Sequence, residues 1–235
     1  MNTEAGRNAG RTARDRARAE LTQEIKDAAR RQLAAEGAER LSLRAVSREL
    51  GMVSSALYRY FPSRDELLTA LIIDAYDALG AEAEAAAKSE SEPRAAWLAV
   101  CRAVRAWAIA HPQEYALIYG SPVSGYQAPQ STVQPASRVI LVLFGILGQA
   151  QASGVLVPPE DAPEPEGLLA EQLGTLTGYA PGVPLKVLGR TAIAWTQLYG
   201  MISFELFGQL VGSMDPADEF FADATEQLAT FLGLP

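Results

Sequence analysis

The chain has 235 residues, enough to bury a sizeable core, and its 49% apolar residues exclude a disordered tail. Its one cysteine, Cys101, excludes an intramolecular disulfide framework and is typical of a reducing cytosol. The net charge of −8 is uneven, because residues 1–65 carry 13 Lys and Arg against 9 Asp and Glu, whereas the rest carry 7 against 19. This asymmetry indicates an N-terminal part that approaches phosphates, although a solvated basic tail on an ordinary domain would give the same pattern.

The spacing of apolar residues predicts helices almost throughout and no convincing strand, so the expected fold class is all-α. The arginine-rich residues 1–20 have no apolar run behind them; they are therefore not a secretory signal and are expected to form a flexible basic arm. The helices expected next are about 21–36, Leu43–Leu50, Ser54–Phe61 and Arg64–Ala87. Ser42 is the expected N-cap of the second helix, and Ser63 with Glu66 forms a capping box for the fourth.

The second part of the chain is also expected to be helical, with Pro- and Gly-rich loops such as "GSPVSGYQAPQ" and "VPPEDAPEPEG" between the helices. The expected elements are Arg94–Ala110, one or two turns within Glu114–Tyr119, Val133–Ala152, Leu168–Leu176, Leu185–Val211 and Pro216–Leu232, the last capped by Asp215. The longest apolar run, Val139–Gly148, has ten residues. A run of that length is too short to cross a bilayer, so no membrane partner is expected.

A helix-turn-helix is indicated by the two short helices on either side of Gly51. Glycine can adopt a positive φ, which lets the second helix cross the first within a few residues. The small core at the crossing is expected to contain Val46, Leu50, Leu57 and Phe61. The side chains left pointing mostly outward are Ser54, Ser55, Ala56, Tyr58, Arg59 and Tyr60. Short hydroxyl groups, tyrosines and an arginine on such a helix are typical of contact with a DNA duplex.

The stretch "LSLRAVSRELGMVSSALYRYFPSRDELLTAL" resembles the N-terminal domain of TetR/AcrR-family transcriptional regulators. The resemblance covers about Glu24–Ala75 and includes Gly51, the Leu57-Tyr58-x-Tyr60-Phe61 run and the Ser-Arg-Asp-Glu-Leu-Leu start of the next helix. It implies an all-α homodimer with a three-helix DNA-binding head and a larger helical body that usually binds a small molecule and carries the dimer interface. The expected division is an arm at 1–20, a helix-turn-helix head at 21–65 and a regulatory and dimerisation domain at 66–235.

The resemblance also implies roles for residues of the head. Ser54 and Ser55 open the recognition helix as candidates for base-edge contact, with Arg59 on the same side, and Ala56 can touch only a thymine methyl group. Arg44 matches a guanine-reading position, although its side chain could instead pair with Glu49 or Glu39.

The remaining head positions that the resemblance assigns concern the DNA backbone. Tyr58 and Tyr60 match phosphate-contacting positions, although the Tyr58 ring could instead pack on the first helix. Arg64 stands at the N-terminus of the fourth helix, where backbone N–H groups also favour an anion.

In the body, "AWAIAHPQEYALIYG" and "AWTQLYGMISFELFG" resemble a subgroup of the same family whose body carries a Trp, a His-Pro and a Trp-x-x-x-x-Gly helix. The candidate ligand-binding residues are Trp107, Tyr115, Tyr119 and Trp195, although aromatic residues at helical spacing are also typical of a core. With one His and one Cys, a soft-metal site is not expected. The chain has no paired-carboxylate, Ser/His/Asp, Cys/His or phosphate-loop signature, so no enzyme activity and no cofactor are expected.

The last two helices, about Leu185–Val211 and Pro216–Leu232, are expected to form a two-fold homodimer interface, although an intramolecular core is the alternative. The residues expected to serve it are Gly200, Ser203 and Gly208, and Leu198, Ile202, Phe220, Leu228 and Phe231. The function implied by the resemblance is a repressor in the bacterial cytosol, at the nucleoid when bound, that leaves a palindromic double-stranded operator when a small lipophilic effector binds. The alternative is a DNA-binding regulator of the same fold that lacks such an effector and responds to a protein partner.

Overall fold

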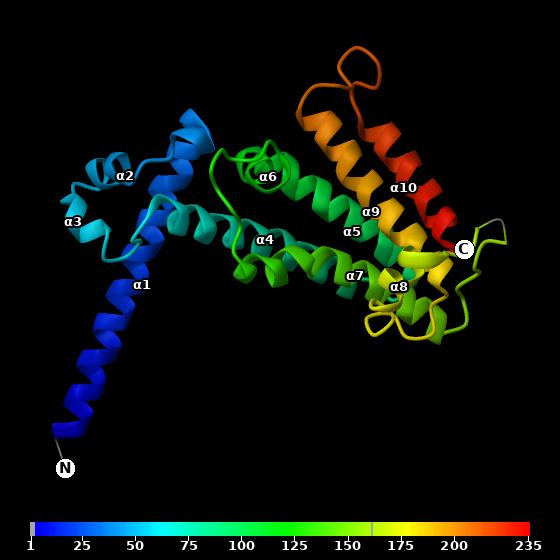
Figure 1. Cartoon of the computed structure of the whole chain (residues 1–235), viewed down its shortest axis with the longest axis horizontal. Helices are drawn as coiled ribbons and strands as arrows, with labels where there is room; N and C mark the ends of the chain where they lie inside the picture. Colours follow the sequence, from blue (N-terminus) through cyan, green and yellow to red (C-terminus); the bar gives the residue numbers. More distant parts are fainter. Residues whose placement is uncertain (1–2, 161) are drawn as a thin grey trace. The chain divides into compact units, whose positions relative to one another are not determined.

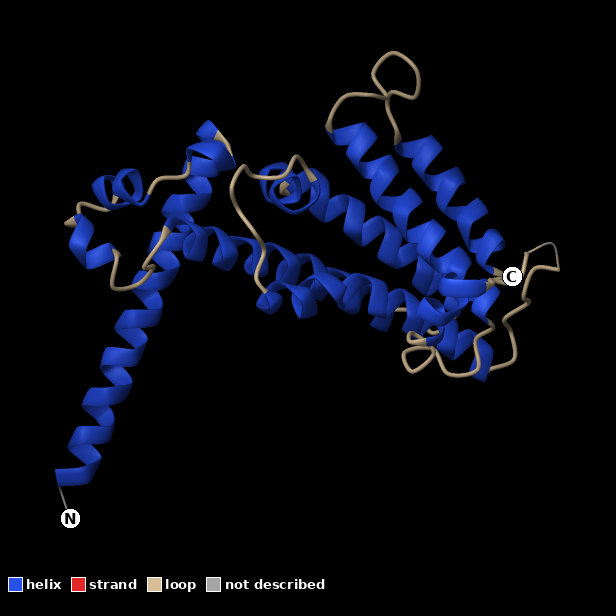
Figure 2. Cartoon of the chain, viewed as in Figure 1, coloured by secondary structure: helices blue, strands red, loops and turns tan. Residues whose placement is uncertain are grey.

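The computed structural model describes residues 3–160 and 162–235, with side chains from Arg14 onward. The described residues form helices and loops without any strand, which confirms the all-α fold class (Figure 2). In chain order (Figure 1) the elements are α1 Thr3–Glu36, η1 Ala38–Arg40, α2 Leu43–Glu49, α3 Ser54–Leu57, α4 Arg64–Lys88, α5 Pro93–Ala110, α6 Pro112–Tyr119, η2 Gln130–Thr132, α7 Val133–Ala152, α8 Gly167–Gly174, α9 Leu185–Leu206 and α10 Asp218–Leu232.

The chain forms two compact units, which we call the head and the body. The head contains the chain up to Asp74 together with Ala116–Thr132, and the body contains Ala75–Tyr115 and Val133–Pro235. Helices α4 and α6 each contribute to both units. The division therefore differs from the expected single boundary after residue 65, because a segment distant in sequence joins the head.

Helix α1 begins much earlier than the sequence analysis predicted. The residues from Thr3 to 20, expected as a flexible arm, are helical and continuous with the expected helix, which ends at Glu36. The physical reason lies in composition, because ten of the residues 3–20 are Ala or Arg, two of the strongest helix formers. Gly37, with a φ of 81°, ends the helix.

The core of the head is built from one face of each of its helices. Ile25 of α1, Val46 of α2, Leu57 of α3 and Leu67 of α4 have no exposed surface. Burying a large aliphatic side chain contributes roughly 1.5–3 kcal/mol relative to leaving it exposed. This small core is what holds α2 and α3 in fixed positions on α1 and α4.

Two hydrogen bonds attach the segment Ala116–Thr132 to the rest of the head. The hydroxyl groups of Thr69 on α4 and Tyr126 are 2.8 Å apart, and the backbone N–H of Ser124 donates to the Glu39 carboxylate at 2.8 Å. The segment begins within α6 and ends directly before α7, so the chain continues into the body at both of its ends.

The core of the body forms where α5 packs against α7, α9 and α10. Trp97 on α5 is 1% exposed, and its indole N–H donates to the carbonyl of Thr225 on α10 at 3.0 Å. Leu198 and Ile202 on α9 are fully buried. These two residues were expected in a dimer interface, and the structure places them in the core instead.

The hairpin of α9 and α10 is shorter than predicted at its connection. Helix α9 ends at Leu206 rather than Val211, because Gly208 has a φ of 82° that an α-helix cannot continue through. Helix α10 begins at Asp218 rather than at Pro216, with Ala217 at its N-cap and no side-chain cap. The expected cap by Asp215 is therefore wrong.

Helix α7 is the most apolar element of the body. The segment Gln130–Ala152 contains an 18-residue stretch with a mean hydropathy of 1.4 and is long and apolar enough to cross a membrane by length and composition alone, unlike the ten-residue run considered above. Core helices of soluble proteins meet the same criterion. Here α7 packs against α5 and α9 and buries Val139, Leu143 and Leu147, as a core helix does.

Candidate nucleic-acid interface

The turn between α2 and α3 has the geometry that a helix-turn-helix requires. Gly51 has a φ of 64°, and the backbone N–H of Met52 returns to the carbonyl of Ser47 at 2.8 Å. Helix α3 covers only Ser54–Leu57, half of the predicted length. The chain continues in tighter turns, because the N–H groups of Tyr60 and Phe61 both donate to the carbonyl of Leu57, at 2.8 and 3.1 Å.

The predicted DNA-contacting residues differ in exposure. The exposed ones are Arg44, Ser55, Tyr58 and Arg59, and the half-buried ones are Ser54, Ala56, Tyr60 and Arg64. All eight belong to α2, α3, the turn after α3 and the first residue of α4. Their backbones are thus brought together in the head, although three of the half-buried side chains, Ser54, Tyr60 and Arg64, make contacts within the protein that were not predicted from the sequence.

The side chain of Ser54 connects α3 to α2 through a hydrogen bond. Its hydroxyl oxygen lies 3.1 Å from that of Ser47 on α2, and the Ser47 hydroxyl donates to the carbonyl of Arg44 at 3.0 Å. Because the Ser47 proton is engaged with that carbonyl, Ser54 is the donor to Ser47. This hydroxyl therefore positions α3, and Ser55 is the exposed serine of the pair.

Arg64 is half-buried, and its guanidinium group binds acceptors of the head itself, including the Asp65 carboxylate at 3.5 Å. Its Nε donates to the carbonyl of Leu41 at 3.2 Å, and its Nη2 donates to the carbonyls of Ala38 and Glu39 at 2.9 and 3.4 Å. A cation beside the carbonyl end of a helical turn is favourable. The expected phosphate contact is not supported by this geometry. The acceptors precede Arg64 by more than twenty residues, so the local sequence could not reveal them.

The carboxylates proposed as alternative partners of Arg44 are engaged elsewhere. Glu49 pairs with Arg31 at 2.7 Å, and Glu39 accepts the N–H of Ser124. Among the described side chains, no carboxylate pairs with Arg44 or Arg59. Both guanidinium groups are consequently available to acceptors outside the protein.

Arg18 is a head residue that the sequence analysis placed in the arm without a specific role. Its Nη2 donates to the carbonyl of Arg59 at 3.4 Å, and its guanidinium carbon lies 5.2 Å from the ring centroid of Tyr60. Cation–π contact of this kind restrains the ring. The helical extension of α1 thus supports the turn that carries Tyr60.

The aromatic residues predicted to bind a ligand contribute largely to packing. Tyr115 is fully buried, its hydroxyl lies 2.9 Å from the Ser203 hydroxyl and 3.1 Å from the Tyr199 carbonyl, and burial raises its pKa. Trp107 is 6% exposed and lies 5.3 Å from the His111 ring. Trp195 meets Tyr199 edge-on at 5.8 Å.

Tyr119 differs from the other three aromatic candidates, because it belongs to the head whereas they belong to the body. Of three hollows described in the body, none is lined by any of the four. The ligand-binding role of Trp107, Tyr115, Tyr119 and Trp195 therefore stays a prediction, and these three hollows lie elsewhere in the body.

The largest of these hollows is a groove of about 530 Å³ between residues 162–166, α8, α9 and Phe231 of α10. Its lining is mostly apolar and includes Leu173 and Ile193, with Lys186 and Arg190 among the charged side chains. Gly189 is one of the lining residues, and a Cβ there would reach only ordinary contact, 3.5 Å from Leu173. The volume is within the range of small-molecule sites.

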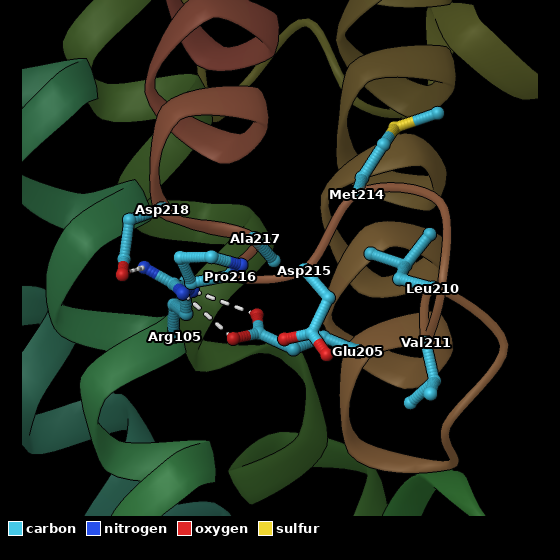
Figure 3. A pocket seen from close by; sticks show the side chains of 9 residues that line it. All are labelled: Arg105, Glu205, Leu210, Val211, Met214, Asp215, Pro216, Ala217 and Asp218. Carbon is cyan, nitrogen blue, oxygen red and sulfur yellow. Dashed lines mark hydrogen bonds and ion pairs between the residues drawn. The ribbon is translucent and has the colours of Figure 1, made fainter.

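The smallest of the three, about 140 Å³, surrounds an arginine clamp at the end of the α9–α10 hairpin (Figure 3). Arg105 on α5 binds both carboxylate oxygens of Glu205, at 2.6 and 2.7 Å, and Asp218 at 2.8 Å. The hydrogen bonds that Arg105 donates to Glu205 raise the pKa of Arg105. Bidentate pairs of this type are geometrically specific. The clamp fixes α9 and α10 to α5, which is a structural role.

A second clamp in the body holds α7 against α4. Arg138 donates to Glu84 and Asp77, both at 2.8 Å, one turn on either side of Gly80. A Cβ at Gly80 would lie 2.7 Å from Nε of Arg138, so only glycine leaves room for this arginine. The hydrogen bond from Arg138 lowers the pKa of Glu84.

The described residues include no group of three His, Cys, Asp or Glu side chains that could hold a metal ion. The fold and the exposed helix-turn-helix define an all-helical DNA-binding regulator. Family models agree: one described as bacterial regulatory proteins of the tetR family matches residues 25–71, and one described as a tetracyclin repressor-like C-terminal domain matches residues 97–228. The chain belongs to the TetR family of bacterial transcriptional regulators.

Individual relatives extend this similarity over most of the chain. The HTH-type transcriptional regulators Rv1816 of Mycobacterium tuberculosis and Mb1846 of Mycobacterium bovis are each 41% identical over 215 residues, covering 88% of this chain and 90% of theirs. The crystal structure of the regulatory protein SCO4313 is 35% identical with a TM-score of 0.75, covering 92% of this chain and 98% of that one. A Rhodococcus sp. RHA1 protein of unknown function is 25% identical with a TM-score of 0.70, covering 91% and 95%.

Proposed function

We propose that this regulator is a repressor in the bacterial cytosol that binds a palindromic operator as a homodimer and leaves it when a small lipophilic ligand binds. The observation that carries the operator contact is the surface formed by Arg44, Ser55, Tyr58 and Arg59, exposed on α2, α3 and the turn after them. Arginine side chains that pair with no described carboxylate can donate hydrogen bonds to phosphate oxygens and base edges. Exposed hydroxyl groups can do the same.

The residues divide between reading bases and holding the backbone. Arg44 binds a guanine through O6 and N7, and Ser55 contacts a base edge in the same major groove. Tyr58 and Arg59 donate to phosphate oxygens, and Tyr60, held by Arg18, does so from a half-buried position. Ala56 touches at most a thymine methyl group.

Selection of bound oligonucleotides from a random pool tests the operator proposal, because two-fold sites whose half-sites are about 34 Å apart are expected from a dimeric helix-turn-helix. Arg44→Ala should relax the preference at one base pair by about 1–3 kcal/mol. Arg48→Ala is the matched control, because Arg48 is also exposed on α2, and it should leave the selected sequence unchanged. An Arg44→Ala variant that selects the same sites as the wild type would refute the base-reading role.

Dimerisation through α9 and α10 is supported by a stripe of exposed or half-buried residues on the two helices. On α9 these are Ile193, Gly200 and Phe204, of which Ile193 and Phe204 are 50% and 55% exposed. On α10 they are Phe220, Leu228 and Phe231, all half-buried. A Cβ at Gly200 would meet no atom within 4 Å, so nothing within the described chain requires a glycine there. A small residue there leaves room for a second copy to approach closely.

Coupling between ligand and DNA is proposed to pass through α4, whose first part belongs to the head and whose second part belongs to the body. The Arg138 clamp holds the body part, and the Thr69–Tyr126 contact holds the head part. A ligand that binds better to the body in which α4 is displaced changes the separation of the two recognition helices. The ligand can shift the equilibrium between the two states by no more than the difference between its binding free energies for them.

The 530 Å³ groove is the ligand site that we propose within the body. Gly189→Leu should fill the groove and abolish ligand-induced release, whereas Gly145→Leu, on an exposed part of α7 with nothing within 4 Å of its Cβ, should preserve release. Because Ile193 and Phe231 belong to both the groove lining and the proposed dimer surface, the dimer dissociation constant and the operator affinity of Gly189→Leu are measured first and should match those of the wild type. A thermal-shift screen of lipophilic compounds supplies the ligands. Consistent absence of hits would favour the same fold acting without a small molecule, in response to a protein partner.

A further inference from the structure

Val53 is an aliphatic residue that the fold of the head does not explain. It lies in the turn between Gly51 and α3 and is 70% exposed. In the head, the only other large apolar or aromatic side chain described as exposed is Tyr58, which has a hydroxyl group to offer. Val53 is therefore an isolated apolar group on a polar surface, and it is not part of an apolar patch that would suit a protein partner.

Local structure gives a second reason to ask why valine stands here. Val53 occupies the N-cap position of α3, where its side chain makes no capping hydrogen bond. Ser, Thr, Asp and Asn are strongly preferred at N-caps because their side chains accept a backbone N–H. The φ and ψ of Val53, −71° and 136°, are ordinary extended values that serine adopts equally well. Valine thus forgoes a cap and leaves most of its apolar surface exposed.

The neighbours of Val53 face the proposed operator. Ser55, two residues later, and Arg44 on α2 are exposed in the same helix-turn-helix, and both are proposed to contact bases. The major groove of DNA presents one apolar group on its base edges, the C5-methyl group of thymine. We propose that Val53 reads a thymine by packing its γ-methyl groups against that methyl, a contact that rests on the operator surface proposed above.

This proposal assigns a different reader from Ala56. Ala56 is half-buried and carries one methyl group, whereas Val53 is exposed and presents two. Removing the Val53 methyls or the thymine methyl should remove the same buried apolar area. Each change alone should therefore weaken binding about three- to tenfold, and the two together should weaken it no more than one alone.

The experiment is a double-mutant cycle between the protein and the base. Oligonucleotide selection with the full-length protein first defines the operator, and each thymine of a half-site is then replaced by deoxyuridine, which removes only the methyl group. Operator affinity is measured for the wild type and Val53→Ala on every duplex. At one thymine, the substitution should weaken the wild type about three- to tenfold and leave Val53→Ala unaffected.

Two further variants separate reading from folding. Val53→Ser should keep or raise the thermal midpoint, because it adds a cap, and should nevertheless lose the preference for thymine at that position. Val157→Ser, at a 63% exposed valine of the body, is the matched control and should leave the preference intact. Equal deoxyuridine effects in wild type and Val53→Ala at every position, or selected half-sites that lack thymine, would overturn the Val53 proposal alone. A wild type that selects no consensus would overturn the operator proposal together with it.

Discussion

The helix-turn-helix of the head and the α9–α10 face of the body are both proposed to bind a partner, yet their exposed side chains have opposite character. The head exposes Arg44, Ser55, Tyr58 and Arg59, whereas the body exposes Ile193 and Phe204 beside a glycine. Charged and hydroxyl groups suit a polyanion whose counterions are released on binding, and apolar groups suit a second copy of the same surface. The difference indicates that salt should distinguish the two interfaces.

The largest effect is expected from salt itself. Raising the salt concentration from 50 to 200 mM should weaken operator binding by about a thousandfold, the loss expected of a protein that makes six or more phosphate contacts. The dimer dissociation constant, measured by analytical ultracentrifugation over the same range, should stay within about threefold, because burial of apolar surface is not screened. A dimer that dissociates in step with the loss of DNA binding would contradict the division between a polar and an apolar interface.

The next effect concerns Gly200 at the proposed dimer interface. Gly200→Trp should raise the dimer dissociation constant about ten- to hundredfold through steric overlap with the second copy. The isolated chain has open space at this position, so its fold should tolerate the change. Gly200→Ala is the control and should stabilise α9 by about 1 kcal/mol. Unchanged association of Gly200→Trp would place the interface elsewhere.

Two arginines of the head provide a comparison within one surface. Arg64→Ala removes hydrogen bonds to the carbonyls of Leu41, Ala38 and Glu39, so it should destabilise the head by about 2 kcal/mol in denaturant unfolding. The salt dependence of operator binding by the Arg64→Ala variant should match that of the wild type. Arg59→Ala should leave stability unchanged and reduce the slope of log affinity against log salt by about 1. The reverse pattern would show that Arg64 is the phosphate contact.

The predictability of the head from sequence has a local cause. Gly51, Ser63 and the apolar positions Val46 and Leu57 specify their turn, cap and core within a few residues, and the structure has them as expected, with the Ser63 hydroxyl accepting the N–H of Glu66 at 3.1 Å. The end of α1 before Gly37 was also predictable, whereas the end of α9 before Gly208 was not. The role of Arg64 was not, because its acceptors lie in another segment.

The body was less predictable because its periodic apolar residues do not reveal which face meets which neighbour. Leu198 and Ile202 are apolar residues that would suit a dimer interface equally well. Only their burial in the body, where α9 packs against α5 and α10, assigns them to the core. The Arg105 and Arg138 clamps join residues more than fifty positions apart, so no local pattern indicates them. Tyr115 likewise contacts Tyr199 and Ser203 of α9, more than eighty positions away in sequence.

The smallest expected effect tests the Arg138 clamp that holds α4 in the body. The pKa of Glu84 is lowered, chiefly by the hydrogen bond from Arg138, below the ordinary value of 4.5 that it regains on unfolding. Its contribution to stability is therefore present above about pH 4.5 and is lost as pH falls through the lower folded pKa.

Glu84→Gln should lower the thermal midpoint slightly at pH 7, because the partly exposed pair contributes little. The difference from wild type should vanish at the acidic end, and Glu82→Gln, whose carboxylate is exposed on the same helix, should show no such convergence. A wild-type minus Glu84→Gln difference that stays constant down to pH 3 would mean that the ion pair does not hold α7 on α4, and the path proposed for ligand coupling would have to begin elsewhere.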